Sequence, residues 1–286
     1  MRIFKKNMQK ICSLEMNIIL RFMNNIQLRG CLLTNAQGFG IIEPAPEESG
    51  REYRKGEKAM KGCLYGVGVG PGDPELMTLK AVKRLAQCQI IAVPDADRGQ
   101  STAYQIAQGA CPEIGEREVL LLRMPMTHDL QALHASHRAA ADRIEEELDQ
   151  GRDVAFLTLG DPTVYATYIY VHQMVAGDGY PTEIVSGVTS FCAAAARLGI
   201  SLAERSQMLH IVPSSHGIRE ALKLPGVKVL MKAGSKMEQV RQDLLEADLE
   251  VAMVENCGMP GERVFYGADQ IPADAGYFSL IVAKDK

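Results

Sequence analysis

The sequence predicts an α/β fold in which strands and helices form layers. Short apolar runs recur along the chain, and segments with apolar residues at helical spacing separate them. Several of these runs end in glycine or proline, as strand ends commonly do. No period of roughly 20–50 residues repeats, which excludes a solenoid. Alternation of this kind is typical of layered α/β proteins.

Strand and helix patterns become strong only from residue 63 onward. The apolar run at 63–69 ends in glycines, Thr78 is a predicted helix N-cap, and Asp129 is predicted to cap a long polar helix that Gly151 ends. The expected strands here are 63–69, 89–93, 118–122 and 153–159. The expected helices are 79–86, 101–109, 129–150 and 163–175.

A glycine- and proline-bearing segment at 177–181 is the strongest internal boundary. It divides the patterned region into an expected N-terminal α/β domain, 60–178, and a C-terminal α/β domain, 179–286. After it the expected strands are 183–186, 208–212, 227–231, 251–255 and 277–283. The expected helices are 189–198, 216–222 and 236–247.

Residues 1–59 differ from the rest of the chain. The first 60 residues carry a net charge of +4, whereas the remainder carries −8. The apolar stretch at 16–20 is too short for a signal peptide and Arg21 interrupts it. Residues 42–58 have the polar, charged, proline-bearing composition of a linker. We therefore expect 1–59 to be an N-terminal appendage, disordered or outside the fold, with Met60 as an alternative translation start.

Composition excludes several classes of protein. The net charge of −4 argues against general nucleic-acid binding, which needs a basic face. No run of 18 apolar residues is present, so no membrane span is expected. Seven cysteines without a CxxC pair indicate a reduced, cytoplasmic chain without a disulfide framework or zinc site. His134 and His137 could share a helix face, but without a third ligand no metal site is predicted, and a solvated face is expected.

The first motif, Gly68-Val-Gly-Pro-Gly-Asp-Pro74, directly follows a predicted strand. Glycines there allow a backbone to approach a ligand closely. A dinucleotide-binding loop is the rival interpretation, and Asp95 or Asp97 could supply its ribose acid. Pro71 and Pro74 lack the N–H groups that such a loop presents, and the helix begins later. The sequence therefore favours a ligand-facing turn, with a purely structural turn as the alternative.

Two further turns follow predicted strands. In Gly160-Asp161-Pro162, Asp161 is expected to cap the next helix, with Pro162 in its first turn. At 186–190, Gly187 allows a sharp turn and Thr189 or Ser190 is expected to cap a small-residue helix. Each turn is also explained by helix capping alone. No G-x-S-x-G elbow surrounds Ser190, so it is not expected to be a nucleophile.

Together these turns and the segment Val254-Glu-Asn-Cys-Gly-Met259 resemble the tetrapyrrole methylase family over about residues 64–282. The closer likeness, carried by 160–165, 168–170 and 188–193, is to the subgroup that methylates C20 of precorrin-2 or its cobalt form. Ser186 stands where the family usually has proline, which could loosen the turn before Thr189.

The resemblance implies two α/β domains with a deep cleft between them, a homodimer, S-adenosylmethionine as cofactor and a tetrapyrrole substrate of cobalamin synthesis. It implies substrate contacts at Gly68, Gly70 and Arg123, but no catalytic residue and no protein-bound metal. The implied cofactor-binding residues are Pro71, Gly160, Asp161, Val164, Tyr165, Thr189, Ser190, Met231 and Ala252.

A polycarboxylate substrate needs local cations, because a body of net charge −8 cannot attract it by its overall field. Three other functions stay open: methylation at another tetrapyrrole carbon, a non-catalytic tetrapyrrole- or nucleotide-binding module, and a nicotinamide oxidoreductase. Whether the substrate already carries cobalt is also open. The candidate cations are Arg123, His128, Arg197, Arg205, His210, His216 and Lys232.

Overall fold

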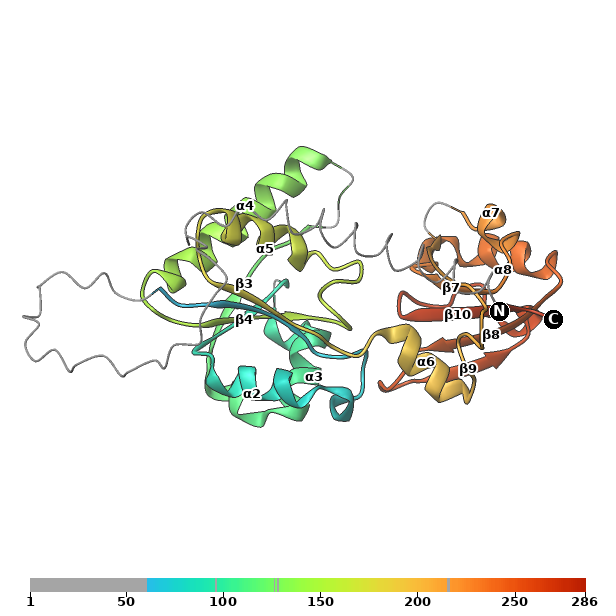
Figure 1. The fold of residues 1–286 in the computed structure, drawn as a ribbon, viewed down its shortest axis with the longest axis horizontal. Helices are drawn as coiled ribbons and strands as arrows, with labels where there is room; N and C mark the ends of the chain where they lie inside the picture. Colours follow the sequence, from blue (N-terminus) through green and yellow to red (C-terminus); the bar gives the residue numbers. More distant parts are fainter. Residues whose placement is uncertain (1–60, 96, 126, 128, 215–216) are drawn as a thin grey trace, which may run out of the picture. The chain divides into compact units, whose positions relative to one another are not determined.

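Two five-stranded β-sheets with helices on both faces make up the described chain (Figure 1). The computed structural model describes residues 61–286 except 96, 126, 128 and 215–216. These residues belong to one compact unit. The predicted appendage 1–59 and two of the candidate cations, His128 and His216, lie outside the described residues.

The first sheet is entirely parallel, in the order β3-β2-β4-β1-β5. Its strands are β1 (Leu64–Gly68), β2 (Ile90–Val93), β3 (Glu118–Leu121), β4 (Val154–Thr158) and β5 (Thr182–Val185). The carboxyl ends of parallel strands meet at one edge of a sheet, where α/β proteins bind their ligands. Because β1 and β4 are neighbours, the glycine turns that follow them lie side by side, and Gly70 forms a bridge with Gly160.

Alternate residues of the first sheet pack against helices on opposite faces. Ile91 and Leu157 contribute to the core on one side, and Ile90 and Phe156 to the core on the other. This strict alternation is the strand period of two with both faces covered. The first core contains α2 (Leu79–Gln87) and α3 (Thr102–Ala110); the second contains α4 (Leu130–Leu148) and α5 (Tyr168–Gly177), as Figure 1 shows.

The second sheet has the order β6-β7-β10-β8-β9 and is mixed. Only β6 and β7 are parallel; the other neighbours are antiparallel. Helix α6 (Ser190–Leu198) packs on one face, and α8 (Met237–Leu245) packs on the other with Ile218 just before α7 (Arg219–Leu222). The strands are β6 (Leu209–Pro213), β7 (Val227–Met231), β8 (Leu249–Glu255), β9 (Arg263–Tyr266) and β10 (Ser279–Asp285).

Several predicted elements agree with the structure, and others need correction. Thr78 and Asp129 cap α2 and α4 with their side chains, as predicted. The helix predicted at 163–175 begins only at Tyr168, because Asp161 closes a tight turn instead of capping a helix. Strand β9 was not predicted; it is a short edge strand that includes the exposed side chain of Arg263. Short 3₁₀ helices lie at Pro74–Leu76, Arg98–Gln100, Pro112–Glu116, Gly234–Lys236 and Ala268–Gln270.

The change from the first sheet to the second comes after β5. The predicted domain boundary at 178/179 precedes that strand, which pairs with β1. The division into two domains remains a prediction. Within the described residues, no helix combines the length and apolar character needed to cross a membrane.

One predicted position of a histidine needs correction. His137 was expected on a solvated face, but it is buried and stacks on Tyr170 with ring centroids 5.2 Å apart. In the part of the chain that the structure describes, no group of three potential ligands could hold a metal ion. The described cysteines are all free: Cys63, Cys88, Cys111, Cys192 and Cys257.

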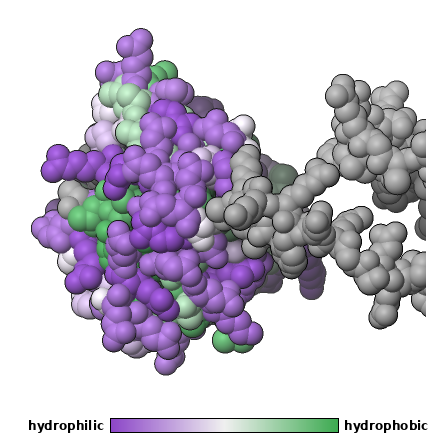
Figure 2. All heavy atoms as spheres, turned by 90° about the vertical axis from the view of Figure 1, so that its left-hand side faces the viewer, coloured by the Kyte–Doolittle hydropathy of each residue, from purple (hydrophilic) through white to green (hydrophobic). Residues whose placement is uncertain are grey.

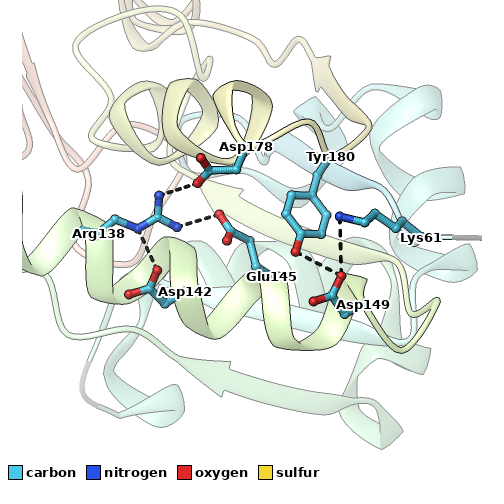
Figure 3. A network of polar contacts seen from close by, with 7 residues as sticks. All are labelled: Lys61, Arg138, Asp142, Glu145, Asp149, Asp178 and Tyr180. Carbon is cyan, nitrogen blue, oxygen red and sulfur yellow. Dashed lines mark hydrogen bonds and ion pairs between the residues drawn. The ribbon is translucent and has the colours of Figure 1, made fainter.

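A polar network fastens α4 to the end of α5 (Figure 3). The Arg138 guanidinium donates to Asp142, Glu145 and Asp178 at 2.6–2.7 Å. Shared ion pairs on one guanidinium hold geometry better than isolated surface pairs do. The face of the molecule shown in Figure 2 is mostly hydrophilic, with separate areas of hydrophobic residues between the hydrophilic ones.

A buried lysine fastens the end of the second sheet. Lys228 is fully buried on β7, and its ammonium donates to the Gly226 carbonyl at 2.8 Å and to Asp285 at 2.5 Å. The other Asp285 oxygen accepts from the Gly226 N–H at 2.7 Å. These donors, Lys228 first, lower the pKa of Asp285 below its ordinary 3.8. The ion pair is therefore satisfied on both sides.

We expect Asp285→Asn to destabilise the fold by about 1–3 kcal/mol, because it leaves a buried ammonium without its counter-charge. The expected loss is below that of a fully buried pair because the Asp285 side chain is 48% exposed. Since the folded pKa of Asp285 is depressed, its contribution is present above the ordinary aspartate pKa and is lost as pH falls through the folded value. Denaturant unfolding of the wild type and the variant checks this: their difference should shrink only in acid. Lys228→Met combined with Asp285→Asn should recover stability; continued loss would contradict the account.

Candidate binding pocket

One pocket opens at the carboxyl edge of the first sheet, where the turns after β1 and β4 meet residues of the second sheet. Its lining is mainly apolar and aromatic, with hydroxyl groups and one residue of each charge, which is typical of a small-molecule site. The lining residues are Pro71, Thr158, Leu159, Gly160, Asp161, Val164, Tyr165, Ala166, Thr189, Ser190, Met231, Lys232, Val254, Cys257, Met259, Tyr277, Phe278, Ser279 and Leu280.

Beside this pocket the backbones of Gly68, Gly160 and Gly187 are in contact. A Cβ atom added at Gly187 would lie 2.1 Å from the Gly160 carbonyl oxygen, and one added at Gly68 would lie 2.6 Å from the same oxygen. Gly160 itself has φ +66°, a conformation that favours glycine, yet its own Cβ would meet nothing closer than 3.9 Å. Backbone contact therefore explains Gly68 and Gly187, whereas Gly160 is explained by its turn.

Asp161 joins the two loops of the first sheet that border the pocket. One carboxylate oxygen accepts from the Thr163 N–H at 2.8 Å and its hydroxyl at 2.5 Å, and the other accepts from the Gly187 N–H at 3.0 Å. Only 8% of Asp161 is exposed. Its carboxylate is thus committed to shaping the pocket.

Two hydroxyl groups of the lining lack hydrogen-bond partners. The Oγ1 atoms of Thr158 and Thr189 are shielded from solvent, and neither has a partner among the residues that the structure describes. Thr189 occupies the N-cap position of α6, but its side chain does not cap the helix. Buried hydroxyls without partners are costly, and in a pocket they point to a polar ligand group as the missing partner.

Backbone strain is concentrated around the pocket. Tyr165, Lys232 and Asn256 all have φ between +51° and +58°, in the left-handed region that non-glycine residues rarely adopt. Tyr165 and Lys232 line the pocket, and Asn256 precedes the lining residue Cys257. In the described chain, Arg205 is the other non-glycine residue with positive φ. Strain of this kind costs of order 1–3 kcal/mol per residue and clusters at functional sites.

The structure brings together most of the predicted cofactor residues. Ala252 is the exception among them: it faces the core of the second sheet. Gly68, Gly70 and Arg123, the predicted substrate contacts, do not line the pocket either. Gly68 and Gly70 are buried beside it, and Arg123 is exposed after β3. The predicted cofactor residues that do line it are Pro71, Gly160, Asp161, Val164, Tyr165, Thr189, Ser190 and Met231.

The wall formed by 277–280 carries no motif, and sequence reasoning missed it. Buried Glu255 positions it: its carboxylate accepts from the Gly276 N–H at 2.6 Å, while Arg263 occupies the other oxygen. The neighbouring Asn256 N–H donates to the Phe278 carbonyl at 3.0 Å. The Val254-Glu-Asn segment therefore supports this wall of the pocket.

Cys257 lines the pocket but is poorly suited to nucleophilic chemistry. Burial, reinforced by the negative charge of Glu262, raises the pKa of its thiol above the ordinary 9.0. Thiolate is the reactive form of cysteine, and a raised pKa depletes it near neutral pH. The described lining of the pocket thus offers apolar surface, hydroxyl groups and one ammonium group to a ligand.

The fold and the pocket define a layered α/β protein with a small-molecule binding pocket at the carboxyl edge of a parallel sheet. A sequence model of the family described as Tetrapyrrole (Corrin/Porphyrin) Methylases matches residues 63–268. The chain belongs to the tetrapyrrole methylase family.

Two curated relatives illustrate this membership. Cobalt-precorrin-2 C(20)-methyltransferase from Salmonella typhimurium is 33% identical over 234 residues, which cover 78% of this chain and 96% of that protein. Cobalamin biosynthesis protein CobIJ from Mycobacterium bovis is also 33% identical, over 235 residues and 78% of this chain. The match spans 46% of the length of CobIJ, so this chain corresponds to about half of that protein.

A solved structure has the same fold. Uroporphyrin-III C-methyl transferase from Thermus thermophilus, complexed with S-adenyl homocysteine, superposes with a TM-score of 0.56 at 22% sequence identity. The match covers 78% of this chain and 97% of that one. The predicted α/β class is therefore confirmed both by the two sheets and by this likeness.

Proposed function

We propose that this protein transfers a methyl group from S-adenosylmethionine to C20 of precorrin-2 or cobalt-precorrin-2, in cobalamin synthesis. The observation that carries the proposal is that eight of the nine residues implied as cofactor contacts, from both sheets, line one pocket. The Salmonella relative named for this reaction supports the position of methylation.

The residues present fit the proposed cofactor. The adenine ring of the cofactor has apolar faces, and Val164, Met231 and Leu280 supply apolar side chains to the lining. The hydroxyl and amino groups of the cofactor would provide partners for the orphaned hydroxyls of Thr158 and Thr189.

When bound, this cofactor supplies an electrophilic methyl group. Methyl transfer disperses the positive charge of a sulfonium, so accurate placement and exclusion of water provide most of the acceleration. In this chain the Asp161 loop and the glycine contacts hold the pocket walls in place. No residue needs to act as a strong base for the attack, and we assign no catalytic residue. Any cobalt belongs to the substrate macrocycle, which chelates it.

The decisive experiment is incubation of the full chain with S-adenosylmethionine and precorrin-2, metal-free or cobalt-loaded. Mass spectrometry should show the gain of one methylene unit, and NMR should place it at C20. A gain at another carbon would favour a different methylase of the same family. Binding without any gain would favour a non-catalytic tetrapyrrole-binding module. Calorimetry with NAD, which should not bind, tests the oxidoreductase alternative.

We expect Thr158→Val and Thr189→Val each to weaken S-adenosylhomocysteine binding roughly fivefold to tenfold, because each removes about 1 kcal/mol of hydrogen bonding. Thermal stability without ligand should be unchanged or slightly higher, since each hydroxyl lacks a partner there. Calorimetry and thermal unfolding check the two signs together. Thr182→Val on β5, outside the pocket, is the matched control. Unchanged affinity in both pocket variants would refute this assignment.

A further inference from the structure

Lys232 is the one cationic side chain that lines the pocket among the described residues. Of the other candidate cations that the structure describes, Arg197 is paired with Glu262, and His210 Nε2 lies 2.9 Å from the Pro225 carbonyl oxygen. Arg123 and Arg205 are exposed residues outside the lining. Among the candidate cations that the structure describes, the tertiary structure thus places only Lys232 in the pocket lining.

The Lys232 ammonium has unused hydrogen-bonding capacity. Within the described residues its contacts are the Tyr165 carbonyl oxygen at 3.4 Å and the Tyr165 ring, whose centroid lies 5.4 Å from Nζ. An ammonium has three donors, and no described carboxylate lies within ion-pair distance of this one. Lys232 is half-buried, so a partner with negative charge would interact with it more strongly than in water.

Both residues of this contact have a strained backbone. Lys232 follows β7 with φ +58°, and Tyr165 lies in the turn after β4 with φ +51°. The Tyr165 hydroxyl in turn donates to the Ile211 carbonyl at 3.3 Å. The strain places a cation over an aromatic ring inside the pocket, where only one acidic residue, Asp161, is present among the lining residues and is already satisfied by three donors.

We propose that Lys232 is the carboxylate-binding residue of the pocket. This inference rests on the proposed function, in which two carboxylates could reach it: that of the amino-acid part of the cofactor, or a side-chain carboxylate of the tetrapyrrole. The N-terminus of α6 is a second feature that favours negative charge. Thr189 does not cap this helix with its side chain, and Ser190, the first residue of the helix, lines the pocket.

The test uses the full chain carrying Lys232→Met, with Lys232→Arg as the charge-preserving variant. Calorimetry compares S-adenosylhomocysteine with 5′-methylthioadenosine, which lacks the carboxylate. Kinetics with precorrin-2 gives KM and kcat separately. Lys236→Met is the matched control. It also removes one lysine charge, four residues further along the chain, but the side chain of Lys236 does not line the pocket.

If the cofactor supplies the carboxylate, Lys232→Met should weaken S-adenosylhomocysteine about tenfold or more and leave 5′-methylthioadenosine unchanged. If the substrate supplies the carboxylate, the affinities for both nucleosides should be unchanged. The KM for precorrin-2 should then rise about tenfold while kcat stays within about twofold. In either case Lys232→Arg should restore most of the loss.

Unchanged affinities and KM, equal weakening of both nucleosides, or an equal effect of Lys236→Met would each overturn the inference. Failure of the wild-type chain to bind S-adenosylhomocysteine at all would instead overturn the proposed function. The two failures are therefore distinguishable.

Discussion

Gly187→Ala should abolish measurable S-adenosylhomocysteine binding and destabilise the fold by about 3 kcal/mol or more. The new Cβ would lie 2.1 Å from the Gly160 carbonyl oxygen and 2.9 Å from the backbone of Gly68. The three atoms nearest to the new Cβ are all backbone atoms of Gly160 and Gly68, so no flexible side chain can move aside. For a body of this size the loss corresponds to a decrease in thermal midpoint of about 6–12 °C.

Gly177→Ala is the matched control for this variant. Gly177 ends α5, and an added Cβ there would meet nothing within 4 Å. Alanine forms helices better than glycine does, so the stability of the Gly177→Ala variant should be unchanged or slightly higher than that of the wild type. Thermal unfolding and calorimetry of both variants separate general intolerance of alanine from the specific contact of three backbones. Wild-type behaviour of Gly187→Ala would show that the turns do not meet as described.

Asp161→Asn should weaken S-adenosylhomocysteine about thirtyfold or more and cost about 2 kcal/mol of stability. The carboxylate accepts from Thr163 with one oxygen and from Gly187 with the other. An amide retains only one acceptor oxygen, so its NH₂ group must face a donor N–H. The pocket wall should loosen, and binding and stability should decrease together.

Asp129→Asn provides the comparison for that substitution. Asp129 is the exposed N-cap of α4 and lies outside the pocket. Asparagine caps a helix about as well as aspartate, so its effect should be small. Equal effects of the two substitutions on ligand affinity would refute a specific role for Asp161.

Sequence patterns predicted the local structure well where one segment carries the whole signal. The strands of the first sheet, and the caps Thr78 and Asp129, needed only periodicity and a capping residue. Most of the residues that the resemblance implies as cofactor contacts line one pocket, because they lie in short motifs after strands; their contact with the cofactor stays a prediction. The start of α5 was predicted too early because Asp161 bonds to Gly187, which lies 26 residues further along the chain.

What only the tertiary structure decided depends on contacts between distant segments. At Gly68 the structure adds a close backbone contact, because Gly160 and Gly187 approach it; its predicted substrate contact stays a prediction. Among the five candidate cations that the structure describes, Lys232 is the one that lines the pocket. The sequence by itself determined the fold class and the family, because periodicity and short motifs are local properties. Pocket composition and charge are properties of packing, since they depend on which loops the sheets bring together.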